Sequence, residues 1–254
     1  MQFKKTVINL VIAVTCLLAG VCHSARAQVS KDYNRAVNLF SHHQIADALL
    51  AVNRSIQHSP NFGPAYALRA NIYCAQDKNK LALRDVAKAV EIEGADKNPD
   101  YYEVAARAHY QNGDPKGAIE ALSRAIKIDP HEDSYWRMRS KMWTILHDEK
   151  KALSDVNNAI KVQSPKAIAN WKVRGDIYMQ QCKFDLAAAD YSSAIQRISK
   201  GKDRDVDSEK LYSIRALAYQ KLGRKDLAAK DTAKVQSVVK DGWGAFLYDE
   251  DKKD

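Results

Sequence analysis

The chain has 254 residues, of which 46% are hydrophobic and 28% are charged, so its composition is that of a folded protein and excludes a mainly disordered one. It contains only ten glycines and six prolines, and its many alanine-rich stretches favour helix over sheet. The formal net charge is +9.

The N-terminal segment, residues 1–27, is predicted to be a secretory signal peptide. Lys4 and Lys5 are followed by an almost unbroken apolar run over residues 7–21, which is shorter than the roughly 20 residues of a membrane-spanning helix. Ala25-Arg26-Ala27 places small residues where signal peptidase reads them, so cleavage is expected before Gln28. The protein is then exported, periplasmic or secreted, with no stable membrane insertion.

Two further possibilities remain open for this segment. Cys22 could be the lipidated cysteine of a lipoprotein, although Ala19-Gly20-Val21 fits that signal poorly. The apolar run could also be retained as an uncleaved anchor, since few flanking charges fix its far side.

The charge of the mature chain is mildly basic. Removal of Lys4, Lys5 and Arg26 lowers the formal net charge from +9 to +6. An exported protein of this charge is not expected to bind nucleic acid, whereas acidic peptides, anionic lipid headgroups and acidic polymers remain possible partners.

From Gln28 onward the chain repeats one pattern. Residues 101–130 predict two short helices joined by a turn at Gly113-Asp114-Pro115, with apolar residues three and four apart after the turn. The pattern starts near residues 29, 63, 99, 133, 168 and 209. Three places in each unit hold small residues where helices should cross closely: Ala36, Ala48 and Ser55; Ala70, Ala82 and Ala89; Ala106, Ala118 and Ala125; Ser140, Ala152 and Ala159; Gly175, Ala187 and Ala194; Ala216 and Ala228.

A helix–turn–helix unit of about 34 residues with these small positions resembles the tetratricopeptide repeat (TPR) family. The resemblance implies an all-α, right-handed α-solenoid of about six repeats, with first helices lining a concave groove and second helices forming the outer wall. The expected repeats span residues 29–62, 63–96, 99–132, 133–166, 168–201 and 209–240, so the array covers 29–240.

Two segments depart from the repeat. Residues 199–208 are charged and predict an exposed loop. The C-terminal tail, residues 241–254, contains Trp243, Phe246, Leu247 and Tyr248. It is expected to fold back as an aromatic cap on the last helix, or else to dock on a partner.

Residues that could carry chemistry are few. Cys74 and Cys182 lie three repeats apart, too far for a disulfide, so both are expected to be free thiols. His42 and His43 are adjacent, and neighbouring helical positions diverge, so solvated turn histidines are expected rather than metal ligands. His109 is expected to be a packed imidazole. The sequence indicates no metal, no cofactor and no enzyme.

The resemblance implies a peptide-binding groove lined by defined first-helix positions. Its candidate residues in this sequence are Tyr33, Phe40, Asn71, Arg107, Tyr110, Arg137, Lys141 and Lys172. Arg107 and Arg137 could each hold a carboxylate bidentately. The family's full carboxylate clamp is absent, because Ala67 stands where a lysine is needed beside Asn71.

These residues predict a non-catalytic protein–protein interaction scaffold of the cell envelope that binds an extended, possibly acidic, peptide segment. The alternative is a chaperone-like or regulatory subunit that holds one client protein. A competing interpretation of the groove charges is that they are solvated and paired with each other. The sequence indicates neither the partner nor the oligomeric state.

Overall fold

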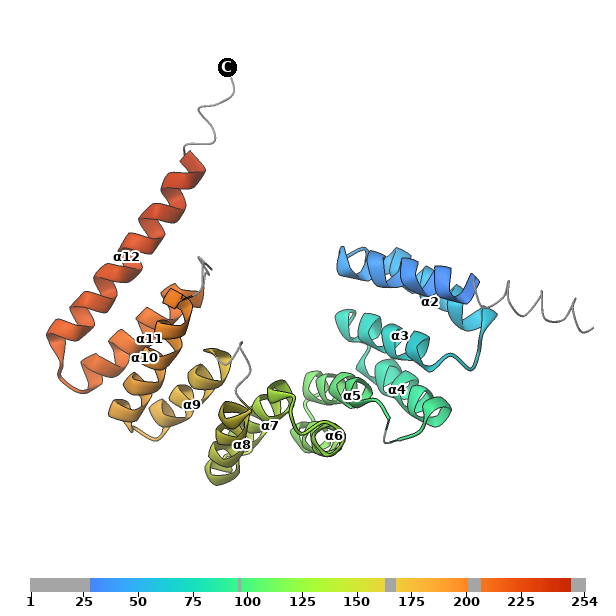
Figure 1. Cartoon of the computed structure of the whole chain (residues 1–254), viewed down its shortest axis with the longest axis horizontal. Coiled ribbons are helices and arrows are strands. Elements are labelled where there is room, and N and C mark those ends of the chain that lie inside the picture. Colours follow the sequence, from blue (N-terminus) through green and yellow to red (C-terminus); the bar gives the residue numbers. More distant parts are fainter. Residues whose placement is uncertain (1–27, 96, 163–167, 201–206, 248–254) are drawn as a thin grey trace, which may run out of the picture. The chain divides into compact units, whose positions relative to one another are not determined.

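The computed structural model describes residues 28–95, 97–162, 168–200 and 207–247, and their regular secondary structure is entirely helical (Figure 1). The first helix covers residues 28–41. The others are α2 (Ile45–His58), α3 (Gly63–Ala75), α4 (Asn79–Glu93), α5 (Pro99–Gln111), α6 (Pro115–Ile128), α7 (Asp133–Ile145), α8 (Glu149–Lys161), α9 (Ile168–Gln180), α10 (Phe184–Lys200), α11 (Asp207–Lys221) and α12 (Lys225–Leu247). The predicted all-α array of about six helix pairs is thereby confirmed. The predicted signal peptide lies outside the described residues.

The chain divides into two compact units, Met1–Ile128 and Asp129–Asp254. Within each unit, consecutive helices pack as antiparallel pairs, and α3 and α5 or α7 and α9 also contact across neighbouring pairs. Each unit is therefore a run of an α-solenoid. The right-handed sense of the whole array stays a prediction.

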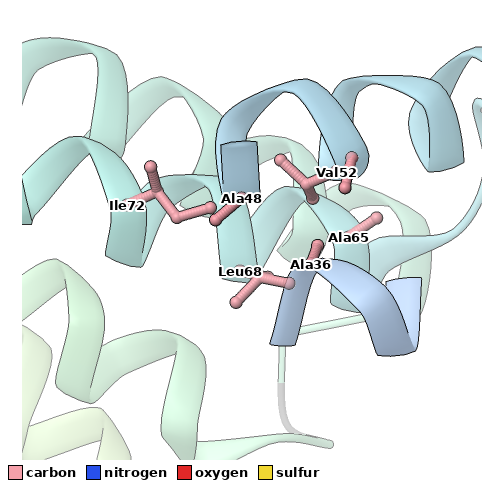
Figure 2. Close-up of a cluster of buried hydrophobic side chains, with 7 residues drawn as sticks. Ala36, Ala48, Val52, Ala65, Leu68 and Ile72 are labelled. Carbon is pink, nitrogen blue, oxygen red and sulfur yellow. The ribbon is translucent and has the colours of Figure 1, made fainter. Parts of the chain in front are cut away.

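Small side chains form the core at the helix crossings. Ala36, Ala48 and Ala65 are completely buried and surround Val52, Leu68 and Ile72 in unit 1, as Figure 2 shows. Ser140 is also completely buried, and its Oγ donates to the carbonyl oxygen of Ala152 at 2.7 Å. The predicted small-residue positions are thus close contacts between helices, and where a serine occupies one, its hydroxyl has a partner.

Gly175 shows why one repeat needs the smallest side chain. A Cβ atom built on Gly175 would lie 2.6 Å from Cε1 of Tyr191, which is almost completely buried. The corresponding pair in the second repeat is Ala70 and Val86, both buried. The bulk of Tyr191 therefore excludes any side chain at position 175.

Each turn within a helix pair contains one residue with a left-handed backbone. These residues are His43, Asp77, Gly113, His147, Cys182 and Gly223, with φ between 56° and 74°. His42 and His43 lie exposed in the first of these turns, as predicted. Only two of the six are glycine, so four turns hold an L-residue in a conformation that costs it energy.

Two predictions about the C-terminal part need correction. α10 extends to Lys200 and α11 begins at Asp207, so helix occupies both ends of the expected loop 199–208, while residues 201–206 lie outside the described residues. α12 runs without a break to Leu247, so residues 241–247 continue the helix instead of folding back over it. No proline follows Lys225, so every later residue has the backbone N–H group that a continuing helix needs.

Candidate functional site

The predicted groove residues lie on the first helices of the pairs, and each unit contributes its own face. The unit 1 face consists of Tyr33, Val37, Phe40, Asn71, Cys74, Arg107 and Tyr110. The unit 2 face consists of Arg137, Lys141, Lys172 and Asp176. Direct packing of α3 on α5 and of α7 on α9 brings side chains from neighbouring first helices together within each face.

The unit 1 face is largely apolar. Tyr33 and Phe40 are half-buried against the core cluster of their unit, and the Tyr33 ring meets Phe62 edge-on with 5.2 Å between ring centroids. Val37 and Tyr110 remain 41% and 52% exposed. Apolar side chains are thus exposed on two first helices of this unit, where an apolar segment could cover them.

The polar residues of the unit 1 face are engaged locally. The Asn71 side-chain amide donates to the carbonyl oxygen of Ala67, one turn earlier, at 3.3 Å. Arg107 Nη2 lies 3.7 Å from Oε1 of Glu103 in a partly exposed ion pair. The Cys74 thiol is buried, and desolvation raises its pKa although Arg107 acts in the opposite direction. Arg107 is therefore partly neutralised by its own helix, as the self-pairing interpretation anticipated.

In unit 2, Arg137 is held by a buried polar network. Its Nη1 donates to Asp133 Oδ2 at 2.7 Å and to Asn170 Oδ1 at 2.8 Å. Asn170 is completely buried and donates in turn to Asp133 at 2.7 Å and to the carbonyl oxygen of Ala159 at 3.1 Å. This network links α7 to α9 and fixes the Arg137 guanidinium at one place.

Lys141 is the centre of positive charge on the unit 2 face. Its side chain is exposed, yet partial desolvation lowers the pKa of its ammonium group, and Arg137 and Lys172 lower it further. Lys172 Nζ lies 2.7 Å from Asp176 Oδ2, and Tyr191 donates to the other oxygen of that carboxylate at 2.9 Å. No ion pair within 4 Å joins Lys141 to a carboxylate of the described residues. Arg137, Lys141 and Lys172 therefore form one cluster with an excess of positive charge.

A charged pair that was not among the predicted features recurs between first and second helices. In each case an arginine beside a small residue forms two hydrogen bonds, through Nε and Nη2, to an aspartate sixteen residues later, at 2.6–2.8 Å. The pairs are Arg69–Asp85, Arg139–Asp155, Arg174–Asp190 and Arg215–Asp231. The guanidinium groups also lie 4.8–5.5 Å from an aromatic ring centroid three residues earlier.

Aligning the repeats could have revealed these pairs, because arginine and aspartate keep a spacing of sixteen in four repeats. The third repeat has Ala105 and Ala121 at the two positions, both buried. The four aspartates are at least 93% buried, so these pairs join helices within the array and are not available to a ligand.

Cysteines and histidines were the remaining candidates for chemistry. Cys74 and Cys182 are free thiols, as predicted. His109 is half-buried, and its Nδ1 lies 2.9 Å from Asp114 Oδ2. Within the described ranges there is no group of three or more metal-ligating side chains, and no helix long and apolar enough to cross a membrane.

Comparisons with known proteins agree with this architecture. A family model described as a tetratricopeptide repeat-like domain matches residues 2–216. DnaJ homolog subfamily C member 3 of Gallus gallus is 23% identical over 245 residues, which cover 89% of this chain and 46% of that protein. The chain thus spans less than half the length of that curated relative.

Solved structures are similar in fold at low identity. PilW, described as a widely conserved type IV pilus biogenesis factor, matches with a TM-score of 0.69 and 14% identity over 82% of this chain and 92% of that chain. YrrB, described as a TPR protein with an unusual peptide-binding site, matches with a TM-score of 0.52 and 19% identity over 65% of this chain and 84% of that chain.

Proposed function

The chain belongs to the family of tetratricopeptide repeat-like domains, and from this premise we propose that it is a non-catalytic scaffold of the cell envelope whose first-helix faces bind an extended segment of a partner protein. Proteins built from tetratricopeptide repeats generally mediate protein–protein interactions and are typically not enzymes. The finer assignments, namely the face, the chemistry of the segment and the compartment, are inferences from this chain's own residues.

The observation that carries the proposal is the cluster on the unit 2 face. Arg137, Lys141 and Lys172 converge there, and only two of the three cations are paired with a carboxylate. Crowding of like charges disfavours the cluster in the unbound protein, so an incoming carboxylate relieves repulsion as well as forming its own contacts. An acidic side chain or a terminal carboxylate of the partner is the group that fits this cluster.

The unit 1 face supports binding of apolar side chains. Val37 is exposed on the same helix as the half-buried rings of Tyr33 and Phe40, and Tyr110 is exposed on α5. The same surface favours the alternative function, a chaperone-like subunit that holds an apolar client, because such binding needs no charge. The two functions differ in their dependence on ionic strength, since only charge recognition weakens steeply with salt.

A library of ten-residue peptides with graded acidity tests the proposal. Binding to the full chain is measured by fluorescence anisotropy at low and high salt. We expect acidic peptides to bind best, and Arg137→Glu or Lys141→Glu to weaken them by about tenfold or more. Lys230→Glu is the matched control, because Lys230 is exposed on α12 and its reversal changes the net charge equally.

Each outcome of this experiment has a defined meaning. Unchanged binding after Arg137→Glu and Lys141→Glu would exclude charge recognition by the unit 2 face. Salt-insensitive binding of apolar peptides, weakened by Tyr110→Ser, would favour the chaperone-like alternative. Equal losses in the Lys230→Glu control would show that net charge alone, and not the cluster, attracts the peptides.

Export is the second part of the proposal. It is supported by the positive residues, apolar run and small residues of segment 1–27. Cleavage before Gln28 is the proposed outcome, and retention as an anchor or lipidation at Cys22 are its alternatives; the family match begins at residue 2 and so includes this segment. Mass determination of the N-terminus of the protein isolated from its native cell distinguishes cleavage before Gln28 from retention, and a chain found inside the cell with an intact N-terminus contradicts export.

A further inference from the structure

The second helices of unit 2 meet one another at their starts. Gln181, which lies in the turn before α10, donates from Nε2 to Glu149 Oε2 on α8 at 2.9 Å. Arg224, which lies just before α12, forms an ion pair with Asp185 on α10 at 2.8 Å. These two contacts place the first turns of α8, α10 and α12 side by side. We call the exposed residues of these three helices the unit 2 wall.

The unit 2 wall carries an excess of positive charge. Of the side chains that the structure describes on α8, α10 and α12, seven exposed ones are cationic and three are anionic. The buried aspartates of these helices, Asp155, Asp190 and Asp231, are paired with arginines of the first helices, so they do not reduce this excess. The wall therefore attracts anionic partners.

Most of the cations have no carboxylate partner of their own. Lys151 Nζ lies 2.8 Å from Asp148 Oδ2, in the turn before α8. Within the described ranges, no carboxylate lies within 4 Å of the other six cations, which are Lys150, Lys161, Arg197, Lys225, Lys230 and Lys234. Their charges are spread over three helices, whereas the cations of the unit 2 face converge at one place. Spread charge suits a broad anionic surface better than a single carboxylate.

Two leucines are exposed on the same wall, near the helix starts. Leu186 on α10 is 48% exposed and Leu227 on α12 is 38% exposed. They hold equivalent positions in neighbouring repeats, one residue before Ala187 and Ala228. Exposed leucines among lysines have the composition of a surface that lies on a lipid bilayer, where apolar side chains enter the boundary of the acyl chains and lysines meet the headgroups.

The combination of lysine and leucine favours a bilayer over an acidic polymer. A soluble acidic peptide or polymer neutralises the cations but leaves both leucines in water. An anionic bilayer attracts every lysine and arginine near its surface and also removes the leucines from water, so both kinds of side chain contribute.

We propose that the unit 2 wall is a peripheral binding surface for an anionic lipid bilayer. Leu186 and Leu227 enter the headgroup region, and the cations of α8, α10 and α12 contact lipid phosphates. This inference goes beyond the proposed function, because it assigns a second surface with a different ligand. The first helices bind the partner segment, while the second helices of unit 2 hold the chain against a membrane.

Co-sedimentation with vesicles tests the proposal. The chain used begins at Gln28, the proposed mature N-terminus, so that the apolar run of residues 7–21 cannot insert into the vesicles. It contains all the helices that the structure describes. We expect it to bind vesicles of phosphatidylethanolamine and phosphatidylglycerol, to bind phosphatidylcholine vesicles at least about tenfold more weakly, and to be released by high salt.

Two double variants separate the contributions of charge and apolar contact. Lys225→Glu/Lys230→Glu should weaken binding to the anionic vesicles by about tenfold or more, because two attractive charges become repulsive. Leu186→Ser/Leu227→Ser should weaken the same binding severalfold, because less apolar surface leaves water. All four side chains are exposed, and circular dichroism checks that the helices of each variant are intact.

Matched controls lie outside the wall. Lys31→Glu/Lys78→Glu changes the net charge equally at two exposed positions of unit 1, and Leu217→Ser removes a leucine that is 45% exposed on the first helix α11. Both controls should retain nearly all of the binding. Losses in these controls as large as in the wall variants would overturn the proposal.

Other results would also contradict it. They are no binding by wild type, or equal binding to anionic and phosphatidylcholine vesicles. Undiminished binding by Leu186→Ser/Leu227→Ser would show recognition of charge alone, as expected for an acidic polymer or protein, and not of a bilayer. Failure of the wall and failure of the proposed function are separable, since Lys225→Glu/Lys230→Glu should leave the binding of acidic peptides unchanged.

Discussion

Arg174 and Asp190 illustrate how single residues join the two helices of a repeat. The guanidinium forms two hydrogen bonds to the carboxylate and a third, at 2.8 Å, to Asn157 on α8 of the preceding repeat. It also lies 4.8 Å from the Trp171 ring centroid. One side chain thus links three helices, and its aspartate is 97% buried.

Removing one partner of this pair is expected to be costly. Arg174→Ala leaves Asp190 buried without its cation and should lower the free energy of unfolding by about 3 kcal/mol, measured by urea denaturation. The double variant Arg174→Ala/Asp190→Ala should be at least as stable as the single one, because it reproduces Ala105 and Ala121 of the third repeat.

The control for this prediction is Arg224→Ala. Arg224 also pairs with an aspartate, Asp185, at 2.8 Å, but both side chains are more than half exposed. Its loss should change stability by no more than about 1 kcal/mol. Similar effects of Arg174→Ala and Arg224→Ala, or a double variant much less stable than the single one, would contradict the role of the buried pair.

Gly175 provides a second prediction at this scale. Gly175→Ala places a Cβ atom against the Tyr191 ring and should destabilise the protein by about 1–3 kcal/mol through overpacking. The double variant Gly175→Ala/Tyr191→Val installs the combination of the second repeat, Ala70 with Val86, and should recover part of the loss. Thermal unfolding measures the stability of both variants. An unchanged melting temperature for Gly175→Ala would mean that the two helices can move apart without loss of stability.

The sequence predicted the small residues of the core but not the arginine–aspartate pairs. Small residues such as Ala82 and Ala118 are visible because a helix crossing excludes large side chains at a fixed period. Arg69 and Asp85 look like ordinary surface charges, since nothing in either residue shows that its side chain is buried. Only the recurrence of an arginine and an aspartate sixteen residues apart in several repeats indicates that these side chains are buried.

At the scale of the element, the turns within the helix pairs are partly strained. Cys182 occupies the left-handed position of the fifth turn with φ of 57°, where the third and sixth turns have Gly113 and Gly223. This conformation costs an L-residue about 1–2 kcal/mol, while glycine loses somewhat more entropy on folding.

Cys182→Gly should therefore stabilise the protein by up to about 1 kcal/mol, measured as a higher urea midpoint. Gly113→Ala, the reverse change in an equivalent turn, should lower the urea midpoint. The exposed Cys182 side chain makes no core contact that glycine would lose. A lower midpoint for Cys182→Gly would show that the thiol stabilises the turn in another way.

The N-terminus of α6 predicts a dependence on pH. The Gly117 amide donates to Asp114 Oδ1 at 2.9 Å, and this hydrogen bond, together with His109, lowers the pKa of Asp114 below 3.8. A carboxylate with a depressed folded pKa contributes stability above its unfolded pKa, and this contribution is lost as pH falls through the folded value. The loss should therefore occur below about pH 4.

Asp114→Asn tests this origin, because asparagine keeps the capping oxygen but cannot titrate. Between pH 7 and pH 3 the urea midpoint of the variant should fall less than that of the wild type. Equal decreases would show that Asp114 does not contribute to acid destabilisation. Asp148 caps α8 and also has a lowered pKa. Because it remains in both proteins, it limits the difference in acid sensitivity between the variant and the wild type.

The positions of the candidate-site residues were predictable from the sequence, but their ion pairs and hydrogen bonds were not. Which first-helix residues face the same way follows from the repeat register, so Arg137, Lys141 and Lys172 could be named together. Whether each cation has a carboxylate partner depends on rotamers and on Asn170, a completely buried residue that belongs to the next first helix. The periodicity of the sequence does not reveal such contacts. The sequence alone therefore could not decide whether the cations of the groove pair with carboxylates of their own chain.

At the scale of the whole molecule, the chain presents two units with different first-helix faces. Unit 1 offers apolar surface, while unit 2 offers an excess of positive charge. The partner segment that we propose carries apolar and acidic groups in different parts of its length. This requirement is stricter than general attraction to a basic protein, because it specifies the chemistry at each unit.

Site-specific photo-crosslinking in the native cell tests the central claim most directly. A benzophenone amino acid replaces Tyr110 or Met179 on first helices and, as matched controls, the exposed Glu120 or Lys150 on second helices. The account predicts that Tyr110 and Met179 trap the same partner protein and that Glu120 and Lys150 do not. Equal or stronger capture of that partner from Glu120 and Lys150 would contradict binding at the first-helix faces.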